Sequence, residues 1–163
     1  AYFDFELKLH GCSHGFTTIA ASGKNACTLH YSENNSILQD GDLILFDLGA
    51  ASGYYGADVS RTYPVNGKFT PRQKELYEVV LKGLEAGLAI SKPGQQKDLI
   101  QLESKRVMAQ ELIRLGIIQK PEEIAKYYKH GSGHFIGLYT HDVGNDAAIL
   151  EKDMVFINVK IKK

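Results

Sequence analysis

Apolar residues in the first part of the chain gather in short runs that are rich in β-forming side chains. The runs cover residues 16–21, 43–48 and 59–65. Turn signals lie beside them at Asp40-Gly41-Asp42 and Asn66-Gly67. The pattern therefore predicts three strands of a sheet.

After residue 70 the apolar spacing becomes helical. Thr70-Pro71-Arg72-Gln73 is a capping box with proline at the first helical position. Apolar residues follow it at intervals of four, at Leu76, Val80, Leu84 and Leu88. These signals predict a helix over residues 71–91. Shorter patterns predict a second helix over 98–115, a short third one from Pro121, a helical fragment over 1–10 that resembles the end of a longer helix, and a strand over 154–161.

Composition narrows the class of protein. The 163 residues are 44% hydrophobic, and 19 basic residues balance 19 acidic ones. We expect a single soluble domain over residues 1–163, located in the cytoplasm, that binds neither nucleic acid nor membrane. No apolar stretch approaches the roughly 20 residues that a membrane helix needs, and the N-terminus lacks the pattern of a signal peptide. Cys12 and Cys27 are expected to be reduced thiols, with a disulfide as the minor alternative.

Two aspartates stand at facing ends of two apolar runs. Asp47 ends one run, Asp58 begins the next, and small residues fill the stretch between them. In a hairpin with Ser52-Gly53 as its turn, the two carboxylates are cross-strand partners. Ionised carboxylates about 5 Å apart repel each other, so a divalent cation is an economical counter-charge. In the alternative, Asp58 caps a turn, Asp47 merely ends a strand, and the register is shifted.

The histidines offer a further ligand. The segment from His130 to His134 has the spacing of a helical zinc pair, but its small residues argue against a helix. An imidazole that leaves such a segment can join carboxylates around a metal, which makes His134 a candidate third ligand. His141 follows, and His30 lies in a predicted strand. For each histidine, a core or surface imidazole is the alternative.

Several motifs together carry a resemblance to a known family. They are Leu29-His30-Tyr31, Asp47-Leu48-Gly49, Ala57-Asp58-Val59-Ser60-Arg61-Thr62, Pro64-Val65-Asn66-Gly67-Lys68-Phe69, His130-Gly131-Ser132-Gly133-His134 and His141-Asp142-Val143-Gly144. In order and spacing they resemble the Xaa-Pro aminopeptidase and Xaa-Pro dipeptidase (prolidase) family of pita-bread metallopeptidases. The resemblance implies an α+β fold, in which helices flank a curved antiparallel sheet with metals on its concave face.

The resemblance also implies roles for particular residues. Asp47 would bind one metal ion, Asp58 would bridge two, and His134 would ligate one. His30 and His141 would hydrogen-bond the substrate and its tetrahedral intermediate, and His130 would line the pocket. Arg61 and Thr62 would orient Asp58, with a surface ion pair as the alternative for Arg61.

The implied reaction is hydrolysis of the Xaa-Pro bond in peptides or dipeptides. Two divalent ions, with manganese expected before cobalt or zinc, would acidify a bridging water to the attacking hydroxide. The implied partners are a proline-containing peptide and, in a homodimer or higher oligomer, further copies of the protein. A methionine aminopeptidase is the alternative among enzymes, and a non-catalytic domain that binds peptides or proteins is the alternative outside them.

The sequence departs from the family pattern near its end. The family has two further glutamate ligands, but Val159 stands at the first of these positions and the second lies past Lys163. We therefore expect a fragment of a longer enzyme that lacks the N-terminal creatinase-type domain and is incomplete at its C-terminal end. Without both glutamates the fragment would be inactive and could lack its metals.

Overall fold

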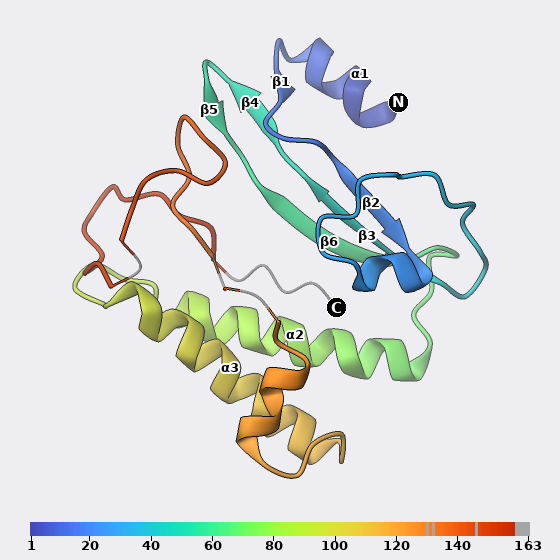
Figure 1. The fold of residues 1–163 in the computed structure, drawn as a ribbon, viewed down its shortest axis with the longest axis vertical. Coiled ribbons are helices and arrows are strands. Elements are labelled where there is room, and N and C mark those ends of the chain that lie inside the picture. Colours follow the sequence, from blue (N-terminus) through green and yellow to red (C-terminus); the bar gives the residue numbers. More distant parts are fainter. Residues whose placement is uncertain (130, 132, 146, 159–163) are drawn as a thin grey trace. The chain divides into compact units, whose positions relative to one another are not determined.

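The computed structural model describes residues 1–129, 131, 133–145 and 147–158 and divides the chain into two compact units (Figure 1). The first unit comprises Ala1–Thr70 and Ile136–Asp142, and the second comprises Pro71–Phe135 and the segment that starts at Val143. The chain thus leaves the first unit, returns to it and leaves it again. The expected single domain over residues 1–163 stays a prediction.

The first unit contains one helix and two small antiparallel sheets (Figure 1). Strand order is β1-β4-β5 in one sheet and β2-β3-β6 in the other. The elements are α1 (Tyr2–Leu9), β1 (Ser13–His14), β2 (Ile19–Ser22), the short 3-10 helix η1 (Gly23–Cys27), β3 (Leu43–Leu48), β4 (Ala50–Ser52), β5 (Tyr55–Gly56) and β6 (Val59–Pro64). The predicted helical fragment and the three predicted strands are confirmed. Strand β2 begins at Ile19 rather than at Phe16, because the register changes by two residues between β1 and β2 and the chain bends there.

Strands β3 to β6 form one long hairpin with a single register. Leu48 pairs with Val59 in the lower part, and Ser52 pairs with Tyr55 next to the turn. The turn is therefore Gly53-Tyr54, and the predicted turn Ser52-Gly53 is wrong. Both turn residues have positive φ, 54° for Gly53 and 73° for Tyr54, as a type I′ turn requires. Tyrosine rarely adopts this conformation, which explains why the sequence pointed elsewhere.

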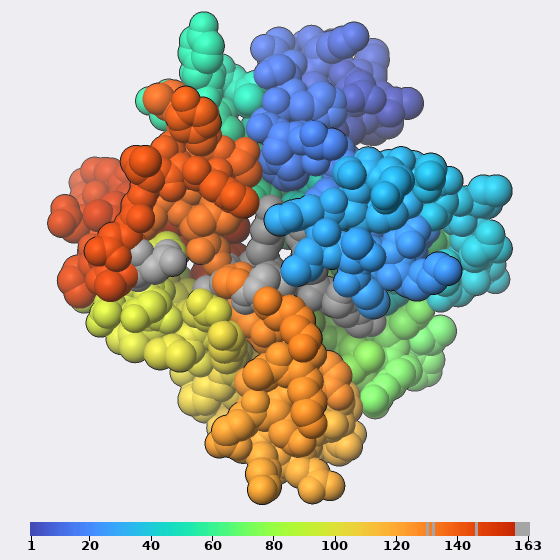
Figure 2. Space-filling view, viewed as in Figure 1, coloured from blue at the N-terminus to red at the C-terminus, as the bar shows by residue number. Residues whose placement is uncertain are grey.

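A buried cluster of the first unit forms beside strand β2. Ile19, Ala21 and Tyr31 pack together and are buried. Residues 32–40, by contrast, are exposed and form the light-blue surface segment of Figure 2. The prediction that His30 lies in a strand is wrong, since it occupies an exposed turn with φ 55°. A left-handed residue interrupts the extended backbone that a strand needs.

The second unit is built on two long helices, α2 (Pro71–Ile90) and α3 (Lys97–Arg114), followed by the 3-10 helix η2 (Pro121–Lys126). All three predicted helical segments are confirmed, and α2 begins at its expected proline. Gly83 and Gly87 lie on the face of α2 that contacts α3, where an added Cβ would clash with Met108 and Ser104. The two glycines thus allow the helices to approach closely.

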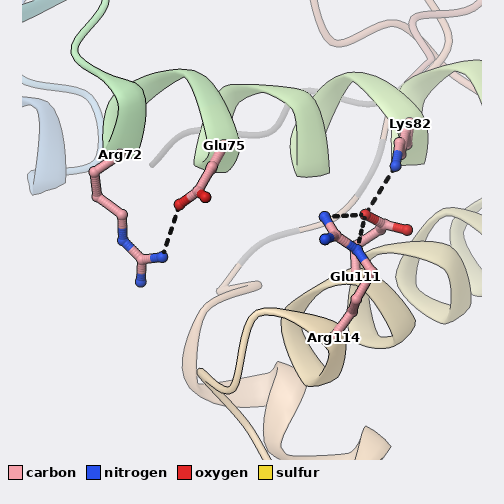
Figure 3. Close-up of polar contacts among 5 residues, drawn as sticks. All are labelled: Arg72, Glu75, Lys82, Glu111 and Arg114. Carbon is pink, nitrogen blue, oxygen red and sulfur yellow. Dashed lines mark hydrogen bonds and ion pairs between the residues drawn. The ribbon is translucent and has the colours of Figure 1, made fainter.

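An apolar cluster and polar side chains join the helices of the second unit. The cluster is made by Val79, Met108, Ala109, Leu112, Ile118 and Tyr128. At the surface, Glu111 accepts a hydrogen bond from Lys82 of α2 at 2.9 Å and from Arg114 at 3.0 Å (Figure 3). These hydrogen bonds hold the pKa of Glu111 below its ordinary value, Lys82 having the largest effect. Exposed pairs of this kind contribute about 0–1 kcal/mol, so the apolar cluster dominates.

The predicted C-terminal strand is only partly described. Its residues 154–158 form a single bridge, between Phe156 and Phe135, instead of a ladder. Alternation predicts a strand only where a partner strand is available, and these residues pair at one position. Cys12 and Cys27 are free thiols, as predicted. Within the described ranges, no helix combines the length with the apolar character that crossing a membrane requires.

Candidate metal centre

Asp47 is a buried carboxylate on the central strand β3. Only 1% of the residue is exposed. Its cross-strand partner is Ser60 on β6, whose hydroxyl donates a hydrogen bond to Asp47 Oδ1 at 2.9 Å. Sequence reasoning missed this role of Ser60, because the partner of Asp47 can be named only once the hairpin register is known.

Asp58 lies where the hairpin is interrupted, immediately before β6. The register places it opposite Gly49, and it is 7% exposed. The two arms of the hairpin lie close together beside Asp58, because Ala57 N–H donates a hydrogen bond to Ala50 O at 2.7 Å. A side chain at position 49 would collide with Ala57 O. The glycine of the Asp47-Leu48-Gly49 motif is thus required by the backbone that carries Asp58.

The two aspartates are diagonal neighbours rather than direct partners. The prediction that they face each other is wrong by a shift of two residues, since Asp47 pairs with Ser60. A shift of two preserves the alternation of faces, so the inference that both carboxylates belong to one face survives. Residues 60 and 62 of β6 are partly buried, whereas 59, 61 and 63 are exposed, which agrees with this assignment.

The buried pair fits a divalent cation. Burying an ionised carboxylate costs several kcal/mol unless hydrogen bonds and opposite charge compensate. Carboxylate oxygens are ligands for hard and borderline divalent ions. Among the residues that the structure describes, no group of three or more His, Cys, Asp or Glu side chains is gathered closely enough to hold a metal. Within the first unit, the two aspartates stay candidates for metal ligands.

Arg61 and Thr62 occupy opposite faces of β6. Thr62 is half-buried on the face of Ser60, whereas Arg61 is exposed and its guanidinium donates to Ser60 O at 2.7 Å. This placement favours the surface alternative for Arg61. Orientation of Asp58 by Thr62 stays a prediction.

His30 and His141 belong to the same unit as the two aspartates. Both are exposed. His141 lies in the returning segment Ile136–Asp142, which is hydrogen-bonded to the hairpin through Gly56 N–H and Gly137 O at 2.9 Å. The first unit thus contains both aspartates and both of these histidines, whose roles toward a substrate stay predictions.

His134 lies in the second unit and is half-buried. Its Nδ1 is 3.0 Å from the carbonyl oxygen of Phe135. Because a carbonyl only accepts hydrogen bonds, Nδ1 carries the proton in the neutral ring and Nε2 is the nitrogen with metal-ligand character. The structure describes His134 and the aspartates in different units, so their joint coordination of a metal stays a prediction. His130 lies outside the described residues.

The backbone around His134 is held from two sides. Ile157 N–H donates to His134 O at 2.8 Å. Lys97, which is 7% exposed, donates to Gly133 O at 3.4 Å and lies 5.4 Å from the centre of the Phe135 ring. Lys97 thus contacts both neighbours of His134. Local sequence patterns could not indicate this contact, because Gly133 lies 36 residues away from Lys97 in the sequence.

Buried carboxylates on one sheet face are donors of the kind that divalent metal ions bind in proteins. Comparison with known proteins identifies the family. The chain belongs to metallopeptidase family M24, whose model matches residues 1–159.

The relatives are aminopeptidases that act next to proline. The chain is 41% identical to the Xaa-Pro aminopeptidase of Escherichia coli over 162 residues, which cover 92% of this chain and 37% of that protein. A solved structure of an aminopeptidase P from Bacillus anthracis is 49% identical, with a TM-score of 0.91 over 94% of this chain and 37% of that one. A zinc-substituted E. coli aminopeptidase P in complex with product is 39% identical, with a TM-score of 0.89 over 94% of this chain and 38% of that one. The predicted α+β pita-bread fold is confirmed, and the chain spans about a third of the length of these relatives.

Proposed function

We propose that the protein containing this chain is a metal-dependent exopeptidase that hydrolyses the Xaa-Pro bond at the N-terminus of peptides. The observation that carries the proposal is the burial of Asp47 and Asp58 on one face of a single hairpin. Membership of a metallopeptidase family and similarity to proteins named Xaa-Pro aminopeptidase support it.

The proposed metal ligands are Asp47, Asp58 and His134. The ions are divalent, with manganese preferred and cobalt or zinc as substitutes. When bound, they would lower the pKa of a water molecule and polarise the scissile carbonyl.

This chain's own residues supply the rest of the chemistry. Ser60 orients the carboxylate of Asp47 through its 2.9 Å hydrogen bond to Oδ1. His30 and His141 donate hydrogen bonds to the substrate and to the oxygen that becomes negatively charged as the peptide bond is attacked. His130, which lies outside the described residues, is proposed to line the substrate pocket.

The 163-residue polypeptide by itself is proposed to be a poor catalyst. Val159, which lies outside the described residues, stands where the family pattern has a glutamate ligand. A missing carboxylate weakens metal binding and removes a candidate general base. Rapid manganese-dependent release of N-terminal residues from Xaa-Pro peptides by this polypeptide would contradict the proposal.

The function is tested with Asp58→Asn in the full-length protein. Asparagine keeps the size of the side chain but removes the charge, so metal content and release of the residue before proline should fall together. The matched control is Asp40→Asn, because Asp40 is exposed in the same unit and its Oδ1 accepts a hydrogen bond from Asn66 that asparagine can also accept. An Asp58→Asn protein that retains its metal and its activity would sink the ligand assignment.

Substrate choice separates the alternatives. Peptides that begin with Xaa-Pro should be cleaved, whereas peptides that begin with methionine and a small residue other than proline should not. The reverse preference would identify a methionine aminopeptidase. Peptide binding without metal and without cleavage would identify a non-catalytic domain.

A further inference from the structure

The segment Ile136–Asp142, here named the His141 loop, is hydrogen-bonded to the rest of the first unit at two points. Near its start, Gly137 O accepts a hydrogen bond from Gly56 N–H of β5 at 2.9 Å. Near its end, Thr140 Oγ1 donates to Gly15 O at 3.2 Å, across 125 residues of sequence. The first attachment uses backbone atoms and is available to any sequence. The second depends on the side chain of Thr140, the residue immediately before His141.

Hydrogen bonds within the loop also hold its own residues together. Tyr139 N–H donates to Asp142 Oδ2 at 3.4 Å, and Gly137 N–H donates to Tyr139 O at 3.2 Å. An added Cβ at Gly137 would collide with the same Asp142 oxygen. A loop with this internal bonding moves largely as one body, so fixing its end through Thr140 fixes the direction in which His141 leaves the backbone.

The acceptor of the Thr140 hydrogen bond belongs to the backbone around Asp58. Gly15 N–H donates to Gly49 O at 2.8 Å, and Gly49 is the residue opposite Asp58 in the hairpin register. Gly15 lies close against both arms of the hairpin, since its added Cβ would be 3.3 Å from Ala50 O and 3.5 Å from Ala57 O. A chain of hydrogen bonds therefore runs from the Thr140 hydroxyl through Gly15 to Gly49, all within the first unit.

We propose that Thr140 is a positioning residue that holds His141 relative to Asp58 by anchoring the end of the His141 loop on Gly15. The inference rests on the proposed function for the role of His141 toward substrate, but not for the anchoring itself. Thr140 contacts no reacting atom. Its hydroxyl acts by restricting where the neighbouring imidazole lies.

The test compares two substitutions in the full-length protein. Thr140→Val has nearly the shape of threonine without its donor, whereas Thr140→Ser keeps the donor and loses only a methyl group. A neutral hydrogen bond contributes about 0.5–1.5 kcal/mol, which corresponds to a decrease of up to about tenfold in kcat/KM for Xaa-Pro peptides in Thr140→Val. Thr140→Ser should restore most of the activity, and bound metal should not change in either variant. Thr28→Val, at an exposed threonine of the same unit, is the matched control.

A second measurement does not need activity. The imidazole signal of His141 in a histidine-labelled NMR spectrum should shift or broaden in Thr140→Val and should match the unmodified protein in Thr140→Ser and Thr28→Val. If the protein proves to have no Xaa-Pro activity, the proposed function fails while this spectrum still decides the anchoring. The inference is overturned if Thr140→Val leaves the His141 signal unchanged, if Thr140→Ser is as defective as Thr140→Val, or if metal is lost together with activity.

Discussion

Gly49→Ala is the sharpest test of how the backbone supports Asp58. A Cβ at this position would lie 1.7 Å from Ala57 O and 2.8 Å from Cε1 of Phe16. Real Cβ atoms do not approach other heavy atoms within 3.0 Å, so the hairpin arms must separate by more than about 1 Å. That movement stretches the 2.7 Å hydrogen bond from Ala57 N–H to Ala50 O beyond its normal range.

The cost of Gly49→Ala follows from two terms. Loss of a backbone hydrogen bond costs about 0.5–1.5 kcal/mol, and overpacking typically costs about 1–3 kcal/mol. We expect the free energy of unfolding to decrease by about 1.5–4.5 kcal/mol, measured by urea unfolding followed by circular dichroism. Because Asp58 is the neighbour of Ala57, the same substitution should also lower bound metal in the full-length protein.

Gly56→Ala is the matched control in the same hairpin. Its added Cβ would meet only Gly137 O, at the ordinary distance of 3.8 Å, and position 56 does not have a positive φ. Alanine should therefore change the stability by less than about 1 kcal/mol, and it can even stabilise by restricting the unfolded chain. Equal urea midpoints for Gly49→Ala and Gly56→Ala would refute the argument that the hairpin arms require glycine at position 49.

Two further predictions concern individual carboxylates. Hydrogen bonds from the Gln119 backbone N–H, then from Lys126 and the Lys120 backbone N–H, lower the pKa of Glu123 to about 2. The ionised Glu123 side chain therefore stabilises the folded protein above the ordinary pKa of the group, and this stabilisation is lost as the pH falls from about 4.5 to 2. Glu123→Gln should therefore lower the thermal midpoint at pH 7, and the difference from the unmodified protein should shrink toward pH 2. Ser60→Ala removes the 2.9 Å hydrogen bond to Asp47 and should lower stability by about 1–3 kcal/mol and metal affinity by about tenfold or more, measured by urea unfolding and calorimetry.

Each of these predictions has a control in the same helix or the same hairpin. Glu122→Gln is the control for Glu123→Gln, because Glu122 is the exposed neighbour in η2. If the thermal midpoints of Glu123→Gln and the unmodified protein differ by the same amount from pH 7 to pH 2, the link between the Glu123 pKa and stability is contradicted. Ser52→Ala is the control for Ser60→Ala, because Ser52 is exposed on the same hairpin. Equal metal affinity in the two serine variants would show that the hydrogen bond does not orient Asp47.

Local signals explain which parts of the fold could be predicted. The helix over 71–91 was predicted to within one residue, because a capping box, an N-terminal proline and the Pro93-Gly94 stop all act within a few residues of chain. The strand over 43–48 was predicted at both ends for a similar reason, since a turn signal precedes it and a small residue follows. The strand expected over 154–161 was not predicted correctly, because a strand forms only beside a partner strand. Residues 154–158 form a single bridge, to Phe135.

The hairpin shows how a wrong register can still give a correct site. Moving the turn from Ser52-Gly53 to Gly53-Tyr54 changes the partner of Asp47 from Asp58 to Ser60. A shift of one residue would have placed the two carboxylates on opposite faces, but a shift of two keeps them together. The register error therefore gave Asp47 the wrong cross-strand partner, but it left both carboxylates on the same face of the sheet.

The residues that escaped prediction share a physical cause. Ser60 acts on Asp47 through the cross-strand register, and Thr140 acts on Gly15 through a contact between distant segments. Neither hydroxyl belongs to a residue type that marks chemistry on its own, and each acquires a role only when folding brings its acceptor within reach. Residues that act directly on a metal or substrate can be recognised by type and spacing, whereas residues that hold them in place can be recognised only from the contacts of the folded chain. For this reason the hydroxyl substitutions at 60 and 140 test contacts seen in the structure, while the substitution at Asp58 tests the ligand role that the family resemblance implies.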